Sequence, residues 1–203
     1  MNFLTSILRK KDEPVQSYAD FWNWFQKHEG TFHKVVKEEG NIEKAFLDKL
    51  SPKLSELKEG FFYLTGMYDD HTVELVLTAD GTVKNLVFVE ELVEVAPEIN
   101  GWRFTALNPA LPIEDVGIRM ADYTFSSETM WFYPNVHSEY PDEIDVTIVH
   151  DALDETNKDM ITNGIYIFLD NYLGELESAT MIDNLIVTGK AEPQEELIPI
   201  SKL

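Results

Sequence analysis

The 203-residue chain contains no cysteine. This absence excludes disulfides, thiolate metal ligands and cysteine nucleophiles, and it is typical of proteins from a reducing compartment. The chain also lacks any apolar run near the roughly 20 residues that a membrane-spanning helix needs. These two absences predict a bacterial cytoplasmic protein that does not associate with a membrane.

Basic residues are scarce beyond the first 60 positions. Lys and Arg total 16 against 37 Asp and Glu, so the net charge is −21. Residues 1–60 hold ten of each kind, and therefore residues 61–203 carry the whole excess. Such a negative field repels nucleic-acid phosphates and attracts cations or basic proteins. We expect a basic protein as partner and no nucleic acid, with solubility alone as the alternative explanation of the charge.

The common catalytic motifs are missing as well. The chain has no GxGxxG, GxxxxGK[ST], GxSxG or HExxH pattern. The stretch DALDETNKD (151–159) has carboxylates at positions 1, 4, 5 and 9 and no central glycine, unlike a calcium-binding EF-hand loop. The sequence therefore predicts no cofactor, and a divalent metal is the one candidate that other residues suggest.

The first segment, MNFLTSILRKKDEP, is a poor secretory signal because its basic residues follow its short apolar part. We expect residues 1–16 to form a tail, with a small amphipathic anchor as the alternative. Residues 17–59 have helical spacing and predict a helical hairpin. Its first helix begins after Ser17 and is either one bent helix or two. Its second begins after Asn41, with a short second helix or a kink at Ser51-Pro52.

After Gly60 the pattern becomes rich in strands. Strands are expected within 61–70, 71–78, 102–107, 118–125, 129–134, 143–149 and 184–189. Helices are expected over 85–96, where a strand is the alternative, and over 156–173, beginning with a capping box at Thr156 and Asp159. Because neighbouring strands outnumber crossover helices, the predicted fold is α+β, a mainly antiparallel sheet packed by helices.

The predicted domain organisation is a single α+β domain over residues 17–203. Within it we distinguish the helical hairpin (17–59), a sheet-rich acidic region (60–190) and an extended tail (191–203).

The first helix carries the aromatic run SYADFWNWFQKHEG. Phe21, Trp24 and Phe25 share one apolar stripe, which predicts core packing. Trp22 lies at the edge of that stripe. Among these aromatic residues it is the one candidate for an exposed binding residue.

An acidic cluster spans residues 137–155, HSEYPDEIDVTIVHDALDE. Carboxylates with an imidazole suit a divalent ion such as magnesium, manganese or calcium. The candidate ligands are His137, Asp142, Glu143, Asp145, His150 and Asp151. Strand alternation places Glu143 and Asp145 on one face, which we expect to meet solvent or a groove. The alternative is a solvated strand face followed by the acidic start of a helix.

Four further residues are candidates for binding. Arg103 and Arg119 are rare cations in the acidic region, and each is either a carboxylate clamp for a ligand or half of a structural salt bridge. Trp131 and Tyr133 share one face of an expected strand, with Phe132 on the other face. One of these faces is core, and the other is a candidate binding surface.

Two segments, VAPEINGWRFTALNP and GIYIFLDNYLGELE, resemble parts of uncharacterised bacterial proteins of unknown function. The resemblance implies a bacterial cytoplasmic α+β protein and assigns no functional residue. The leading hypothesis is a non-enzymatic interaction protein, of the immunity or inhibitor type, that masks a basic toxin or nuclease. A metal-dependent enzyme built on the carboxylate and histidine cluster is the second hypothesis. A small-ligand binder lined by aromatic residues is the third.

Overall fold

The computed structural model describes residues 14–136, 139, 144–190 and 196–203. Its α-helices are α1 (Tyr18–Lys37), α2 (Asp48–Leu57), α3 (Val83–Glu94), α4 (Lys158–Leu173) and α5 (Glu175–Thr180), with a π-helical turn η1 (Glu43–Leu47) and 3-10 turns η2 (Ile113–Asp115) and η3 (Ile200–Lys202). Its strands are β1 (Phe62–Met67), β2 (Val73–Thr78), β3 (Trp102–Ala106), β4 (Ile118–Met120), β5 (Tyr123–Phe125), β6 (Met130–Asn135), β7 (Asp145–His150), β8 (Asn184–Gly189) and β9 (Ile198–Pro199). The predicted α+β class is confirmed.

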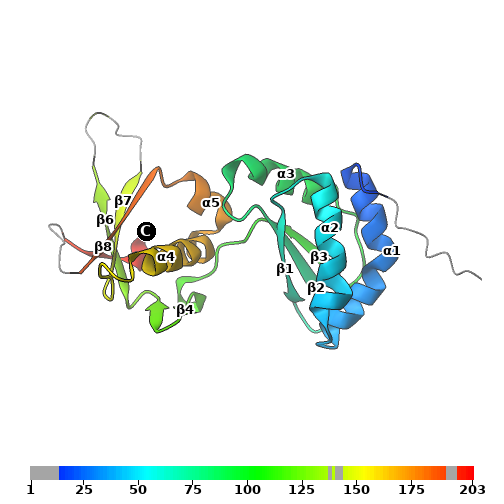
Figure 1. Cartoon of the computed structure of the whole chain (residues 1–203), viewed down its shortest axis with the longest axis horizontal. Helices are drawn as coiled ribbons and strands as arrows, with labels where there is room; N and C mark the ends of the chain where they lie inside the picture. Colours follow the sequence, from blue (N-terminus) through cyan, green and yellow to red (C-terminus); the bar gives the residue numbers. More distant parts are fainter. Residues whose placement is uncertain (1–13, 137–138, 140–143, 191–195) are drawn as a thin grey trace, which may run out of the picture. The chain divides into compact units, whose positions relative to one another are not determined.

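The chain divides into two compact units (Figure 1). The first unit contains the described residues up to Glu59, together with 65–74 and 94–103. The second unit contains 60–64, 75–93 and the described residues from Phe104 onward. The single domain expected over residues 17–203 stays a prediction.

In the first unit, α1 is one uninterrupted helix of 20 residues. Its start is capped as expected, because Ser17 Oγ accepts a hydrogen bond from the Asp20 N–H at 3.2 Å. Basic side chains at Lys34 and Lys37 occupy its last turn, where they oppose the negative end of the helix dipole. The sequence left open whether this segment forms one helix or two, and the structure has a single helix.

Aromatic rings hold α1 in place from two directions. The Phe25 ring lies 6.2 Å from Phe46 of η1 and 4.9 Å from Trp102 of β3. Trp22 packs edge-on against Phe21 and Phe25 at 5.0 and 5.6 Å and is only 3% exposed. The expected exposure of Trp22 is therefore wrong. Because neighbours cover α1 from two directions, the buried part of its circumference is wider than the apolar stripe that helical spacing predicts.

The second helical segment begins where expected, since Asn41 Oδ1 accepts the Lys44 N–H at 3.0 Å. The π-helical turn η1 leads directly into α2, and α2 continues through Pro52. Of the two alternatives at Ser51-Pro52, a short second helix or a kink, the second helix does not occur, because α2 runs through both residues. Together α1, η1 and α2 form the predicted N-terminal helix pair, and α1 and α2 lie side by side in Figure 1.

Strands β1, β2 and β3 form a three-stranded sheet in that order. The turn between β1 and β2 is closed by a hydrogen bond from the Tyr68 N–H to Thr72 O at 2.8 Å. Within it, the Asp69 carboxylate accepts the N–H groups of His71 and Thr72, each at 2.7 Å. These bonds hold the pKa of Asp69 below its ordinary value.

The second unit contains a four-stranded sheet with the order β8-β7-β6-β9. β7 runs antiparallel to β6 and parallel to β8, and α4 and α5 form the crossover between β7 and β8. α4 lies against this sheet (Figure 1), and its Ile165 and Phe168 are fully buried with Phe132 and Ile148 of the strands. β4 and β5 form a separate antiparallel pair.

The first turn of α4 differs from the expected capping box. Thr156 donates both its N–H and its hydroxyl to the Asp154 carboxylate, at 2.7 and 2.6 Å, so it does not cap α4. These bonds lower the pKa of Asp154. Asn157 lies at the cap position instead, and its side chain bonds to Ala152 O and to the hydroxyl of Tyr123. The helix ends at Gly174, as predicted.

Candidate functional site

A tight turn between β2 and α3 begins the site. Thr82 N–H donates to Ala79 O at 3.0 Å, and both central residues have positive φ, 50° at Asp80 and 70° at Gly81. This is the conformation of turns with an Asp-Gly centre, where glycine lacks the Cβ that disfavours positive φ. The turn therefore presents the exposed Asp80 side chain at a defined place.

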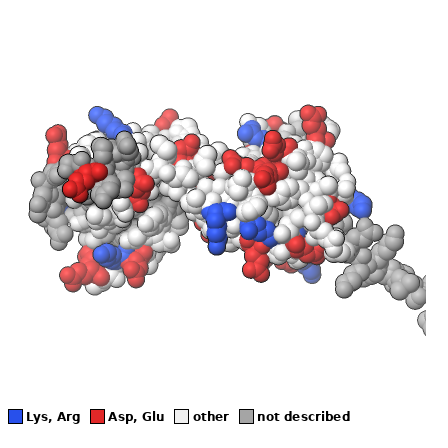
Figure 2. Space-filling model, turned by 90° about the horizontal axis from the view of Figure 1, so that it is seen from above, with Lys and Arg blue, Asp and Glu red and all other residues white. Residues whose placement is uncertain are grey.

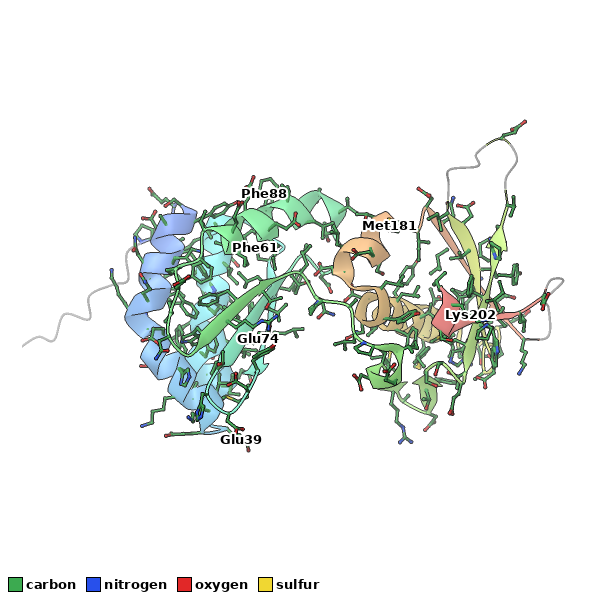
Figure 3. The ribbon with its side chains drawn as sticks, turned by 180° about the vertical axis from the view of Figure 1, so that it is seen from behind. Glu39, Phe61, Glu74, Phe88, Met181 and Lys202 are labelled. Carbon is green, nitrogen blue, oxygen red and sulfur yellow. The ribbon has the colours of Figure 1, made fainter. Side chains whose placement is uncertain are left out.

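Glu175, the first residue of α5, is a fully buried carboxylate beneath this turn. Its Oε1 accepts the N–H groups of Ala79 at 2.8 Å and Gly81 at 3.1 Å, and its Oε2 accepts the N–H of Asn108 at 3.0 Å. In return, Asn108 O accepts the Glu175 N–H at 2.9 Å. All of these residues belong to the second unit. One buried side chain on α5 thus holds both the β2–α3 turn and the segment that follows β3. In Figure 3, α5 ends near the label Met181.

Asp170 lies half-buried on α4 next to this junction. Its Oδ2 accepts a hydrogen bond from Asn108 Nδ2 at 3.1 Å. Burial raises the pKa of Asp170, and although the Asn108 bond lowers it, the nearby charges of Glu175 and Asp80 raise it again. The site therefore favours the arrival of a proton or a cation at Asp170.

Asp80, Gly81, Asn108 and Asp170 border a pocket with a volume of about 660 Å³, which we call the Asp170 pocket. Its polar lining includes Asp80, Asn108, Asn163, Tyr166, Asp170 and Asn171. Leu64, Ile167 and Ile182 contribute apolar surface. In the part of the chain that the structure describes, no residue of this lining is Lys, Arg or His.

The side chains of the pocket are rich in hydrogen-bond acceptors. A serine nucleophile is activated by a general base within hydrogen-bond reach of its hydroxyl. Ser178 is the one serine among the described lining residues, and it has no histidine beside it in that lining. Two carboxylates and several amide oxygens instead form a concave set of hydrogen-bond acceptors.

The predicted metal cluster is only partly visible. His137, Asp142 and Glu143 lie outside the described residues. Among the residues that are described, no group of three or more His, Asp and Glu side chains is placed to hold a metal ion. Asp145 and His150 stand at opposite ends of β7, which separates them by about 16 Å at the usual rise of a strand. The metal site stays a prediction that rests on residues beyond the described part.

Asp145 is not on a solvated face, and that expectation is wrong. The residue is 8% exposed and accepts a hydrogen bond from Asn184 Nδ2 at 2.7 Å. The reason is strand order, because β7 lies between β6 and β8 and every residue of β7 is buried. Alternation correctly separates Val146 and Ile148, which face the core, from Asp145, but it does not reveal that the second face is covered too.

His150 is buried at 1% exposure with both ring nitrogens bonded. Nδ1 accepts the Ala152 N–H at 3.1 Å, so it carries no proton, and Nε2 donates to Thr124 O at 3.0 Å. The neighbouring Asp151 carboxylate lies 3.5 Å from Nδ1. His150 therefore anchors the β5 end of the second unit, and its nitrogens are already occupied.

Arg103 takes part in an ion pair. Its Nε lies 3.0 Å from Glu74 Oε1, and its guanidinium stacks 4.1 Å from the centre of the Tyr68 ring. Glu74 is labelled on the β2 strand in Figure 3. Arg119 is exposed on β4 opposite Thr124. Of the two alternatives for Arg103, the structure has the salt bridge.

Trp131 and Tyr133 share a half-buried face of β6, and Phe132 faces the core. The ammonium group of Lys190 lies 4.2 Å from the centre of the Trp131 ring. The pairing register places Trp131 beside Val149, and Tyr133 beside Thr147. The two predicted aromatic residues therefore do share one sheet face, and this face is not part of the Asp170 pocket.

Sequence reasoning missed the residues that form the pocket. Nothing in the sequence linked Asp80 to Asn108 or Asp170. The two segments that resemble bacterial proteins contain Asn108 in one and Asp170 with Glu175 in the other. The hydrogen bonds of Glu175 join these two segments, but the resemblance itself assigned no functional residue.

The comparisons with known proteins add no assignment. No protein-family model, curated protein or solved structure matches the chain. No helix in the described part of the chain combines the length and apolar character that crossing a membrane requires.

Proposed function

We propose that this chain is a non-enzymatic interaction protein of the cytoplasm that binds a basic protein, in the manner of an immunity protein or inhibitor. The observation that carries the proposal is the Asp170 pocket, a concave site with two carboxylates and, among its described lining residues, no cation. It lies in the part of the chain that carries the whole net charge of −21.

The surface charge supports the same partner. On the face drawn in Figure 2, acidic side chains are spread widely and do not gather in a single patch. A spread field of one sign speeds the approach of an oppositely charged protein, and a pocket then provides the specific contact. Arginine- and lysine-rich toxins and nucleases are the chemistry that such a surface attracts.

The test is affinity capture with the full chain from extracts of its source cells, at about 50 and 500 mM salt, with quantitative mass spectrometry. We expect an enriched protein of basic composition that the higher salt releases. A variant neutralised at four exposed acids of the second unit should lose this protein at lower salt. Its substitutions are Glu114→Gln, Asp115→Asn, Asp122→Asn and Glu128→Gln.

The matched control removes the same number of exposed acids from the first unit. Its substitutions are Glu39→Gln, Glu43→Gln, Asp48→Asn and Glu59→Gln. The control should retain the partner to nearly the salt concentration of the unchanged chain. Capture of proteins no more basic than the extract, or equal loss in both variants, would contradict the proposed function.

A further inference from the structure

We propose that the Asp170 pocket binds a primary alkylammonium group, carried either by a lysine side chain or by a free polyamine. The lysine source rests on the proposed function, because it makes this pocket the anchor site for the basic partner. The polyamine source stands without it.

The negative charge of the pocket favours binding of a cation. Asp80 and Asp170 both line it, and Glu175 lies close enough to act on Asp170 electrostatically. The oxygens of Glu175 are already bonded to three backbone N–H groups, so Glu175 adds negative charge without competing for the ligand. The two remaining carboxylates are open to a guest from the pocket.

The amide groups are oriented as acceptors. Asn108 Nδ2 donates to Asp170, and Asn171 Nδ2 donates to Ile167 O at 2.7 Å. A carboxylate and a carbonyl only accept hydrogen bonds, so these bonds fix which side of each amide is NH₂. Both residues line the pocket, and their amide oxygens are hydrogen-bond acceptors. An ammonium group has three donors and no acceptor, which matches this set.

The geometry favours ammonium over guanidinium. Arginine binds carboxylates best through two parallel hydrogen bonds to both oxygens. Asn108 Nδ2 takes one acceptor position of Asp170 Oδ2, so a guanidinium bound to both oxygens would share Oδ2 with this amide, whereas a single donor can bind at Oδ1. A compact ammonium group needs only that oxygen and the neighbouring amides.

The apolar lining suits the carbon chain behind the ammonium group. Leu64, Ile167 and Ile182 offer aliphatic surface in the same pocket as the acids. Lysine and polyamine methylene groups pack on such surface while their charged ends reach polar partners. The volume of about 660 Å³ exceeds the needs of an inorganic ion and accommodates a chain of this kind.

The test is isothermal titration calorimetry on the full chain. The probes are spermidine, a lysine-containing peptide, the same peptide with arginine, and Mg²⁺ at matched ionic strength. We expect spermidine or the lysine peptide to bind, and the arginine peptide and Mg²⁺ to bind at least about fivefold more weakly. Asp170→Asn should weaken binding by about tenfold or more, since it removes a charged acceptor.

The matched control is Asp159→Asn, which removes an exposed acid of the same helix outside the pocket, and it should change binding less than about twofold. Binding of both amine probes, or of the lysine peptide alone, supports the inference with a protein lysine as ligand. Spermidine binding alone supports the inference and counts against the proposed function. Absence of amine binding, equal binding of the arginine peptide, or equal loss in Asp159→Asn would overturn the inference. A captured basic partner that is unaffected by Asp170→Asn would overturn the lysine source of the ammonium group while leaving the proposed function in place.

Discussion

At the scale of single residues, Glu175 is the most demanding position in the second unit. A fully buried carboxylate is costly to desolvate, and here three backbone N–H groups compensate the charge. Because each N–H comes from a different residue, one side chain fixes the Ala79–Gly81 turn and the segment at Asn108 together. Its role is to hold the wall of the pocket.

We expect Glu175→Gln to lower the free energy of unfolding by about 2–4 kcal/mol, measured by urea denaturation. The amide keeps the shape of the side chain but places an NH₂ group against backbone N–H donors. Glu177→Gln, on the exposed side of the same helix, is the control and should change stability by less than about 0.5 kcal/mol. Similar small effects for both variants would show that Glu175 does not hold these segments.

Asp170 predicts a dependence of stability on pH. Burial raises the pKa of its carboxyl in the folded state, so the folded chain binds this proton more tightly than the unfolded chain. Stability from this group is therefore present at low pH and falls as pH rises from the ordinary carboxyl pKa through the raised value. Asp170→Asn removes that loss and should raise the melting temperature at pH 7 by about 1–2 °C, a small effect because solvent screens a half-exposed group.

The measurement is thermal unfolding at pH 7 and at about pH 3.5, where the wild-type carboxyl is protonated and the advantage of Asp170→Asn should vanish. Asp159→Asn, at an exposed position of the same helix, should show no such pH-dependent gain. If Asp170→Asn were less stable than the wild type at pH 7, or if their difference in melting temperature did not change with pH, the raised pKa of Asp170 would be contradicted.

At the scale of elements, local signals predicted most boundaries. Ser17 and Asn41 cap their helices as expected, and the helix predicted over 85–96 is present but covers 83–94. The errors lie where a competing local bond was available. Thr156 bonds to Asp154 in place of the helix end, which no spacing rule distinguishes from a capping box.

Two glycines within helices should respond oppositely to alanine. A Cβ at Gly164 of α4 would meet the ring of Phe125, whereas nothing lies within 4 Å of a Cβ at Gly30 of α1. We expect Gly164→Ala to destabilise the fold by about 1–3 kcal/mol through overpacking. Gly30→Ala should stabilise it by about 0.5–1 kcal/mol through helix propensity. Chemical denaturation measures both, and a gain at Gly164 would show that the ring does not pack tightly on α4.

At the scale of the whole molecule, the order of expected strands and helices predicted the fold class but not the site. The pocket brings Asp80, Asn108 and Asp170 together from positions up to 90 residues apart, and no motif spans such separations. Strand order is equally long-range, which is why the central place of β7 and the burial of Asp145 were not predictable. Local periodicity tells which residues share a face, and only the assembled sheet tells what covers it.

The placement of the four tryptophans gives the two units different optical signals. Trp22, Trp24 and Trp102 are buried in the first unit, whereas Trp131 is the one tryptophan of the second. Intrinsic fluorescence therefore reports mainly on the first unit, and circular dichroism reports on the helices of both. In a Trp131→Phe chain the tryptophan emission would come from the first unit alone, so spectroscopy without any added dye can distinguish whether one unit melts before the other.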